Sequence, residues 1–228
     1  NSWHSWVCIP KLHGDNNTIN VLSHMPPHLG EVNGHIGKII QRNKFENHNR
    51  WPNIPVYIDL TEELAYALGL YVAEGSISHR ENGEPNGTIG FCFNINETYY
   101  AQKAAEFFQS FGLAVDIRPR PSKTIVEVLA SSVPLAWLLS SMCGDGSKSK
   151  KIPSEIMSAP FNIRASFLNG LLDGDGKSLS STNLNSSRTL KVSSGHLAWQ
   201  ARTIMADMGH WNNVGQGIEN NKQYYTLP

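Results

Sequence analysis

Two acidic residues that lie 101 positions apart share one local setting. Glu74 is followed by Gly75, and Asp175 is followed by Gly176. Each acid ends a segment with helical periodicity, so its carboxylate faces the negative end of a helix dipole, at a cost of about 0.3–1 kcal/mol. A divalent cation would turn this unfavourable placement into coordination, and oxygen ligands without nearby His or Cys favour Mg²⁺ over zinc. The pair predicts a Mg²⁺ site that could also take Mn²⁺, whereas either acid alone could be a solvated helix end.

Small residues recur at every fourth position of the segments that lead to these acids. The first segment carries Ala65, Gly69 and Ala73, and the second carries Ser166, Gly170 and Gly174. A glycine inside a helix costs about 1 kcal/mol relative to alanine. Close backbone contact between two helices offsets that cost. We therefore expect the two stripes to face each other, which would bring Glu74 and Asp175 together.

The elements around the two acids follow the same order twice. The first copy predicts helices over 61–74, 97–112 and 134–142, with strands over 88–95, 115–117 and 124–129. The second predicts helices over 162–175 and 196–208, with strands over 190–193, 214–218 and 223–227. Gly75, Gly112, Gly176 and Gly209 are expected to end helices. A repeated helix–strand–helix–strand unit of the α+β class is the simplest account.

These residues resemble the two-motif LAGLIDADG homing endonucleases. Residues 67–75 correspond to the first motif and residues 168–176 to the second. The resemblance implies two pseudo-symmetric αββαββα halves, whose antiparallel sheets form a saddle over the major groove of double-stranded DNA. It also implies a monomer that makes a double-strand break in a long, asymmetric DNA target by Mg²⁺-dependent phosphodiester hydrolysis.

The resemblance assigns roles to individual residues of this chain. Glu74 and Asp175 become the catalytic, metal-binding acids, and no backbone ligand is assigned at position 73. The basic segment over 146–153 supplies an assisting lysine, Lys150, with Lys151 as the alternative register. These lysines could instead form a solvated loop that touches the DNA backbone. For the second half, Lys222 is a weak candidate for an equivalent lysine.

Polar residues on the strands and their connections are candidates for DNA contacts, because alternate strand side chains can point into a groove. Each of them taken alone could equally be an ordinary exposed polar residue. The first half offers Arg80, Asn82, Asn94, Asn96, Arg118, Arg120 and Lys123. The second half offers Lys177, Asn183, Asn185, Arg188 and Lys191.

The composition limits the predicted function and location. The chain has 19 Lys and Arg against 19 Asp and Glu, which counts against a generally basic nucleic-acid binder. Its first residues lack the basic and apolar regions of a signal peptide, and no apolar run is long enough to span a membrane. Cys8, Cys92 and Cys143 are read as reduced thiols. We expect an intracellular, cytoplasmic protein that is not secreted.

The chain is expected to divide into a 1–58 extension, a first half over 59–150 and a second half over 151–228 that lacks its closing helix. Residues 6–11 resemble the strand that ends the splicing portion of an intein, so an intein origin is considered. The alternative function is a non-catalytic LAGLIDADG-type nucleic-acid binder, such as an intron maturase or a transcription regulator. A small-molecule carboxylate hydrolase is disfavoured, because no nucleophile elbow or phosphate loop is present.

Overall fold

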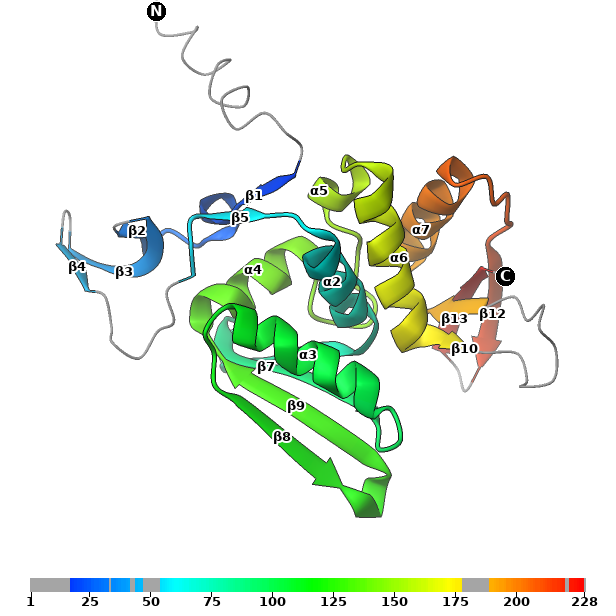
Figure 1. Cartoon of the computed structure of the whole chain (residues 1–228), viewed down its shortest axis with the longest axis horizontal. Helices are drawn as coiled ribbons and strands as arrows, with labels where there is room; N and C mark the ends of the chain where they lie inside the picture. Colours follow the sequence, from blue (N-terminus) through cyan, green and yellow to red (C-terminus); the bar gives the residue numbers. More distant parts are fainter. Residues whose placement is uncertain are drawn as a thin grey trace, which may run out of the picture.

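The fold consists of two αβ halves that meet along a pair of central helices, with short strands packed at one end (Figure 1). The computed structural model describes residues 17–32, 34–41, 44–46, 54–177, 189–219 and 222–227. None of the helices in these ranges is long and apolar enough to cross a membrane.

The central pair consists of α2 (Glu62–Glu74) and α6 (Phe161–Asp175). Helix α2 begins where the sequence predicts. The Thr61 hydroxyl accepts a 3.2 Å hydrogen bond from the Leu64 amide, and Glu62 and Glu63 occupy the first turn, where the helix dipole favours acids. In Figure 1 the α2–α6 pair lies between the two sheets.

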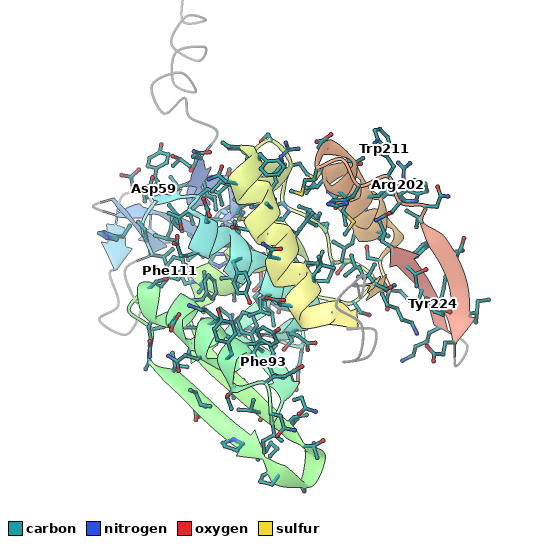
Figure 2. The ribbon with its side chains drawn as sticks, turned by 45° about the vertical axis from the view of Figure 1, so that its right-hand side comes forward. Asp59, Phe93, Phe111, Arg202, Trp211 and Tyr224 are labelled. Atoms are coloured by element: carbon teal, nitrogen blue, oxygen red, sulfur yellow. The ribbon has the colours of Figure 1, made fainter. Side chains whose placement is uncertain are left out.

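The first sheet is antiparallel, with the strand order β6-β7-β9-β8. Its strands are β6 (Gly75–His79), β7 (Pro85–Asn94), β8 (Val115–Arg120) and β9 (Ile125–Ser131). Helices α3 (Thr98–Ser110) and α4 (Val133–Cys143) cover one of its faces. The core beneath α3 is aromatic: the Phe91 ring lies 5.5 Å from Phe108 and 5.9 Å from Phe93, which is labelled in Figure 2. Burying these large rings fixes which face of the sheet meets the helices.

The second sheet repeats this topology. Its strands are β10 (Gly176–Lys177), β11 (Thr189–Val192), β12 (Gly215–Glu219) and β13 (Lys222–Leu227), in the order β10-β11-β13-β12. Helix α7 (Gly195–Asp207) packs against it, and the short helix α5 (Ser154–Met157) lies in the connection between the halves. The matching strand orders confirm the predicted repeat. Strand β13 ends at Leu227, the last described residue.

Gly75 directly follows the last residue of α2, as predicted, but it lacks the left-handed conformation that is common in glycines at helix ends. Gly75 has φ −79° and ψ 147°, which is extended backbone, and it begins strand β6 directly. A side chain would be excluded for a different reason, because a Cβ at Gly75 would overlap the Tyr71 ring and lie 2.5 Å from the Tyr71 carbonyl oxygen. By contrast, Gly112 and Gly209 have φ values of +69° and +85°, as expected for glycines that end helices.

The described part of the N-terminal extension consists of short strands and one 3₁₀ helix. These elements are β1 (Thr18–Asn20), the 3₁₀ helix η1 (Val21–His24), β2 (Leu29–Val32), β3 (His35–Gln41), β4 (Lys44–Glu46) and β5 (Tyr57–Asp59). Ile19, Val21 and Ile54 are fully buried, so this segment is continuous with the core. Residues 6–11, which resemble an intein strand, lie outside the described residues.

Candidate active site at the ends of the central helices

The interface between α2 and α6, called here the seam, is a backbone-to-backbone contact. A Cβ at Gly69 would overlap the carbonyl oxygen of Phe167, and a Cβ at Gly170 would overlap that of Tyr66. A Cβ at Gly174 would collide with the side chain of Ala73. The two small-residue stripes therefore face each other, as their spacing predicts.

Polar contacts fix the position of the two helices along the seam. The Tyr66 hydroxyl donates a 2.9 Å hydrogen bond to the Asp173 carboxylate near one end. The Asn162 amide donates a 2.7 Å hydrogen bond to Glu62 near the other. These contacts oppose sliding of one helix past the other, so the last turns of α2 and α6 stay in register.

The two predicted acids meet where this register places them. Glu74 is the last residue of α2 and Asp175 is the last residue of α6, and each helix passes directly into the first strand of a sheet. A Cβ at Gly174 would lie 3.3 Å from Cγ of Glu74, so the Glu74 side chain packs against the last turn of α6. The seam thus delivers both carboxylates to the junction of the two halves.

The surroundings of the pair disfavour two negative charges. Burial raises the pKa of Glu74 to about 7, and the nearby Asp175 carboxylate contributes to that increase. Burial likewise raises the pKa of Asp175 to about 7. The positive charge of Lys150 acts in the opposite direction on both acids. Half-buried carboxylates with raised pKa values are typical of sites that bind a cation or move a proton.

Lys150 is a buried lysine of the first half that lies near the two acids. It is 5% exposed, and its Nζ donates a 2.7 Å hydrogen bond to the Tyr71 carbonyl oxygen in the last turn of α2. The same Nζ lies 3.6 Å from the centre of the Tyr71 ring. Burial lowers the pKa of Lys150 to about 8, although Asp175 and Glu74 are among the groups that favour its charged form.

A tight turn after α4 holds Lys150 in this place. Its amide donates a 3.0 Å hydrogen bond to the Gly146 carbonyl oxygen. Gly144 has φ +75°, and a Cβ there would overlap the Ser149 carbonyl oxygen, so this turn requires glycine. Lys151 points elsewhere: it lines a separate cavity with His24, Glu155 and other residues. Lys222 begins β13 on the second sheet, paired in register with Glu219.

The donor set suits a hard divalent cation only in part. Within the described residues, no group of three or more His, Cys, Asp or Glu side chains is arranged to hold a metal ion. Glu74 and Asp175 supply carboxylate oxygens, the ligands that Mg²⁺ and Mn²⁺ accept. Mg²⁺ commonly uses one or two carboxylates and completes its shell with water and substrate phosphate oxygens. The residues present therefore fit a cation that is held jointly with a phosphate.

Each sheet has a face that no helix of the described residues covers, called here the open face. On β9 the side chains of Val126 and Val128 point to the helices and are buried, so Glu127 points to the open face. The register places Arg118 opposite Glu127 and Arg120 opposite Ile125, which puts both arginines on the same face. On β11, Leu190 and Val192 are buried, so Lys191 lies on the open face of the second sheet.

The other predicted DNA contacts are placed less uniformly. Arg80 lies at the turn after β6, Asn94 ends β7, and Lys123 ends the 3₁₀ helix η2 (Pro121–Lys123). Asn82 and Asn94 accept hydrogen bonds from the amides of Glu84 and Asn96, respectively, so they stabilise turns. Asn183, Asn185 and Arg188 lie outside the described residues, and only the backbone of Lys177 is described.

Acids that were not predicted as site residues share the open faces with these cations. Asp116 lies two residues from Arg118, Glu127 is hydrogen-bonded to Arg120, and Glu219 is hydrogen-bonded to Lys191. Asp116 and Glu127 could have been found from strand alternation. Alternation places residues 116, 118 and 120 on one face of β8, and residue 127 of β9 lies on the same face of the sheet. The contact between Glu219 and Lys191 depends on strand pairing, which a single strand does not reveal.

Comparison of the sequence with known proteins finds relatives that share only a segment. No family model matches. The chain is 28% identical over 152 residues to an uncharacterised protein of Methanocaldococcus jannaschii, covering 65% of this chain and 16% of that protein. It is 27% identical to the ATP-dependent DNA helicase Hel308 of Thermococcus kodakarensis (72% and 14%) and to a DNA polymerase of Thermococcus sp. strain GE8 (53% and 7%). The chain thus spans about a sixth or less of these relatives.

Comparison of the fold finds solved structures of the homing endonuclease I-DmoI. Mesophilic variants of that enzyme match with a TM-score of 0.55 and 12% identity, covering 74% of this chain and 89% of the other. I-DmoI in complex with DNA and Mn matches with a TM-score of 0.55 and 13% identity, covering 74% and 90%. With its two acids at the ends of a glycine-lined helix pair and its repeated antiparallel sheets, this chain has the two-motif LAGLIDADG fold of the homing endonuclease I-DmoI.

Proposed function

We propose that this chain is a site-specific homing endonuclease that makes a double-strand break in a long DNA target by divalent-metal-dependent hydrolysis. The observation that carries the proposal is the convergence of Glu74 and Asp175 at the junction of two sheets, with raised pKa values and a buried lysine beside them. The fold likeness to I-DmoI, which has been solved bound to DNA and Mn, supports it.

In this mechanism each acid works at the junction of its own helix and sheet. Glu74 and Asp175 would bind Mg²⁺, or Mn²⁺, together with phosphate oxygens of the two strands. When bound there, the cation would supply a water of lowered pKa and stabilise charge on the leaving oxygen. Its positive charge also favours ionised carboxylates, which opposes the burial that raises their pKa values.

Lys150 contributes positive charge near Glu74 and Asp175. Its Nζ is fixed by the Tyr71 carbonyl oxygen and the Tyr71 ring, so no reorganisation is needed when negative charge increases at a phosphate. A pKa of about 8 leaves the amine mostly protonated at neutral pH. Lys150 therefore acts as a preorganised cation of the first half.

The open faces of the two sheets form the DNA-binding surface in this proposal. Arg118 and Arg120 in the first half and Lys191 in the second lie on these faces, where alternate side chains could reach base edges and phosphates. Arg80, Asn94 and Lys123 border the first sheet, and Lys177 and Arg188 are assigned to the second from the sequence. A single chain with two such halves reads an asymmetric duplex as a monomer.

The pattern of relatives supports a mobile origin. Stretches of 121 to 173 residues of this chain match a helicase, a DNA polymerase, a replication factor C small subunit and a transcription initiation factor IIB, and cover only 7–16% of each. Proteins of such different names match a small part of their length to one chain most simply when that part is an insertion. We infer an intein-borne endonuclease acting inside the cell, with an extension over 1–58 and halves over 59–150 and 151–228.

The test is selection of cleaved molecules from a randomised duplex library with and without Mg²⁺, followed by sequencing of the ends. The expected result is one enriched target that is cut only with the metal. Glu74→Gln and Asp175→Asn should abolish cutting while binding of the target survives. Asp207→Asn is the matched control, because Asp207 also ends a helix, and its ion pair with Arg164 lies near the start of α6, away from the end that carries Asp175. Normal cutting by both active-site variants would contradict the proposal.

A different outcome of the same experiment would favour the alternative function. Binding of DNA that is indifferent to Mg²⁺, with no nicking of any library member, would favour the non-catalytic binder on the same fold. Cutting by the wild-type protein and by Asp207→Asn, but not by Glu74→Gln, would exclude that alternative.

A further inference from the structure

The cations of the open faces already have acidic partners within the protein. Arg118 donates a 2.6 Å hydrogen bond from Nε to Asp116, and Arg120 donates a 3.0 Å hydrogen bond from Nε to Glu127. In the second half, Lys191 is hydrogen-bonded to Glu219. A surface that is proposed to bind a polyanion thus carries its own anions, in both halves.

In the first half the charges form one continuous network. The strand register places Arg118 of β8 directly opposite Glu127 of β9. On the same face of β8, Arg118 lies between its partner Asp116 and Arg120. The hydrogen bond with Asp116 raises the pKa of Arg118, and the charge of Glu127 adds to this increase. Acid and cation alternate across β8 and β9, so each arginine is neutralised by a close carboxylate.

In the second half the pair reaches across a strand. Lys191 lies on β11 and Glu219 on β12, with β13 between them in the sheet. The Nζ of Lys191 lies 4.1 Å from the centre of the Tyr224 ring on β13, and the hydrogen bond with Glu219 raises the pKa of Lys191. Figure 2 labels Tyr224 on this sheet. The lysine is thereby held over an aromatic ring and bound to an acid at once.

These ion pairs reduce the net positive charge that the open faces present to a DNA duplex. Non-specific affinity for DNA comes from cations that neutralise phosphates and release counterions. A cation with a carboxylate at hydrogen-bond distance offers little net charge, and its acid repels phosphates until contacts elsewhere compensate. Repulsive elements of this kind increase discrimination between partners by weakening the wrong complexes. The balance of 19 basic and 19 acidic residues in the chain is consistent with such a surface.

We propose that Asp116, Glu127 and Glu219 are specificity-determining residues, which act as built-in counterions and suppress binding to non-target duplex DNA. The inference rests on the proposed DNA-binding function and deepens it. Non-target duplexes are excluded because each phosphate contact by Arg118, Arg120 or Lys191 requires that an internal ion pair be broken. At the target, base contacts stabilise the complex enough to offset that loss.

The test is the variant Asp116→Asn/Glu127→Gln/Glu219→Gln, measured by fluorescence anisotropy on a random-sequence DNA duplex over a series of salt concentrations. The expected result is tighter binding than wild type at low salt. The slope of log K against log salt should steepen by about 0.9 for each cation that gains a phosphate contact. Glu106→Gln is the matched control, since Glu106 pairs with Lys103 at 2.9 Å on α3, on the helix-covered side. Melting curves check that all variants fold.

The outcomes separate the two proposals. Binding by wild type and by the triple variant with equal affinity and equal salt slope would overturn the counterion role alone. Glu106→Gln removes one negative charge and the triple variant removes three, so an increase in Glu106→Gln of a third or more of that in the triple variant would also overturn it, because net charge and not position would then be the cause. No binding by any of the proteins at low salt would overturn the DNA-binding proposal together with the inference.

Discussion

The amine of Lys150 joins the last turn of α2 to the turn that follows α4. Its Nζ donates to the Tyr71 carbonyl oxygen at 2.7 Å and lies 3.6 Å from the Tyr71 ring. The Tyr71 hydroxyl in turn donates a 3.3 Å hydrogen bond to the Gly144 carbonyl oxygen. Tyr71 precedes Glu74 by three residues, so one buried cation is built into the scaffold that positions the first acid.

We predict that Lys150→Met lowers the cleavage rate by about tenfold or more, because it removes a preorganised positive charge next to the acids. Methionine keeps the length and apolar contacts of the lysine stem, so the fold is expected to persist. Lys151→Met is the control and should cut at close to the wild-type rate, since Lys151 lines a different cavity. Single-turnover cleavage of the selected target gives the comparison, and the reverse order of effects would show that Lys151 is the assisting lysine.

The seam predicts an asymmetry between two neighbouring positions of α6. Gly170→Ala should lower the free energy of unfolding by about 1–3 kcal/mol, because the added Cβ would overlap the Tyr66 carbonyl oxygen and force the helices apart. Asn169→Ala, one residue earlier on the exposed side, should change it by less than about 0.5 kcal/mol. Denaturant unfolding measures both. Equal effects would mean that α2 and α6 do not pack at this distance.

The acid pair predicts a pH-dependent stability difference. Glu74 ionises near its usual pKa of 4.5 in the unfolded chain but at about 7 in the folded protein, because burial disfavours its charge. The folded state is therefore penalised progressively as the pH rises from about 4 to about 7. Glu74→Gln should match the wild type near pH 4 and be more stable at pH 8, by on the order of 1–2 kcal/mol.

Denaturant unfolding at the two pH values, without divalent metal, measures this difference. Glu106→Gln serves as the control, because Glu106 is an exposed acid whose pKa is lowered by its hydrogen bond with Lys103. A Glu74→Gln variant that is less stable than wild type at pH 8 would contradict the prediction. It would mean that the carboxylate stabilises the fold in its ionised form.

The attachment of the extension depends on His24. Its Nδ1 lies 3.0 Å from the Ser141 hydroxyl on α4, and its Nε2 lies 3.1 Å from a Glu155 carboxylate oxygen on α5. His24→Ala should destabilise the protein by about 1–2 kcal/mol and speed proteolysis within residues 17–60. His210→Ala, an exposed histidine after α7, should do neither. Limited proteolysis followed by mass spectrometry locates the cuts. A protease pattern unchanged by His24→Ala would show that the His24 contacts do not hold the extension in place.

The helices and longer strands could be predicted from the sequence, because each has a strong local signal. Thr61 caps α2, alternation marks β7, and φ-positive Gly112 and Gly209 follow α3 and α7. The small-residue stripes even predicted a tertiary contact, since glycine inside a helix is unfavourable unless something approaches its backbone.

The rest depends on interactions that are remote in sequence. Strand β6 follows α2 without a turn, and the sequence did not predict a strand there. The distinction between Lys150 and Lys151 rests on a turn that Gly144 makes possible, which spacing alone did not resolve. The pair between Lys191 and Glu219 forms across an intervening strand. The roles assigned to Glu74, Asp175 and the DNA-contacting residues remain predictions that the experiments above address.

The glycine-lined seam has a consequence for how such a protein could diversify. Main-chain atoms, not side chains, set the distance between α2 and α6, so substitutions elsewhere in either half have little leverage on the separation of Glu74 and Asp175. The open faces lie on strands beyond the seam and are free to exchange residues one at a time. If the proposed endonuclease function holds, recognition can thus drift from one sequence to another over generations, while the stagger between the two cuts stays an inherited constant.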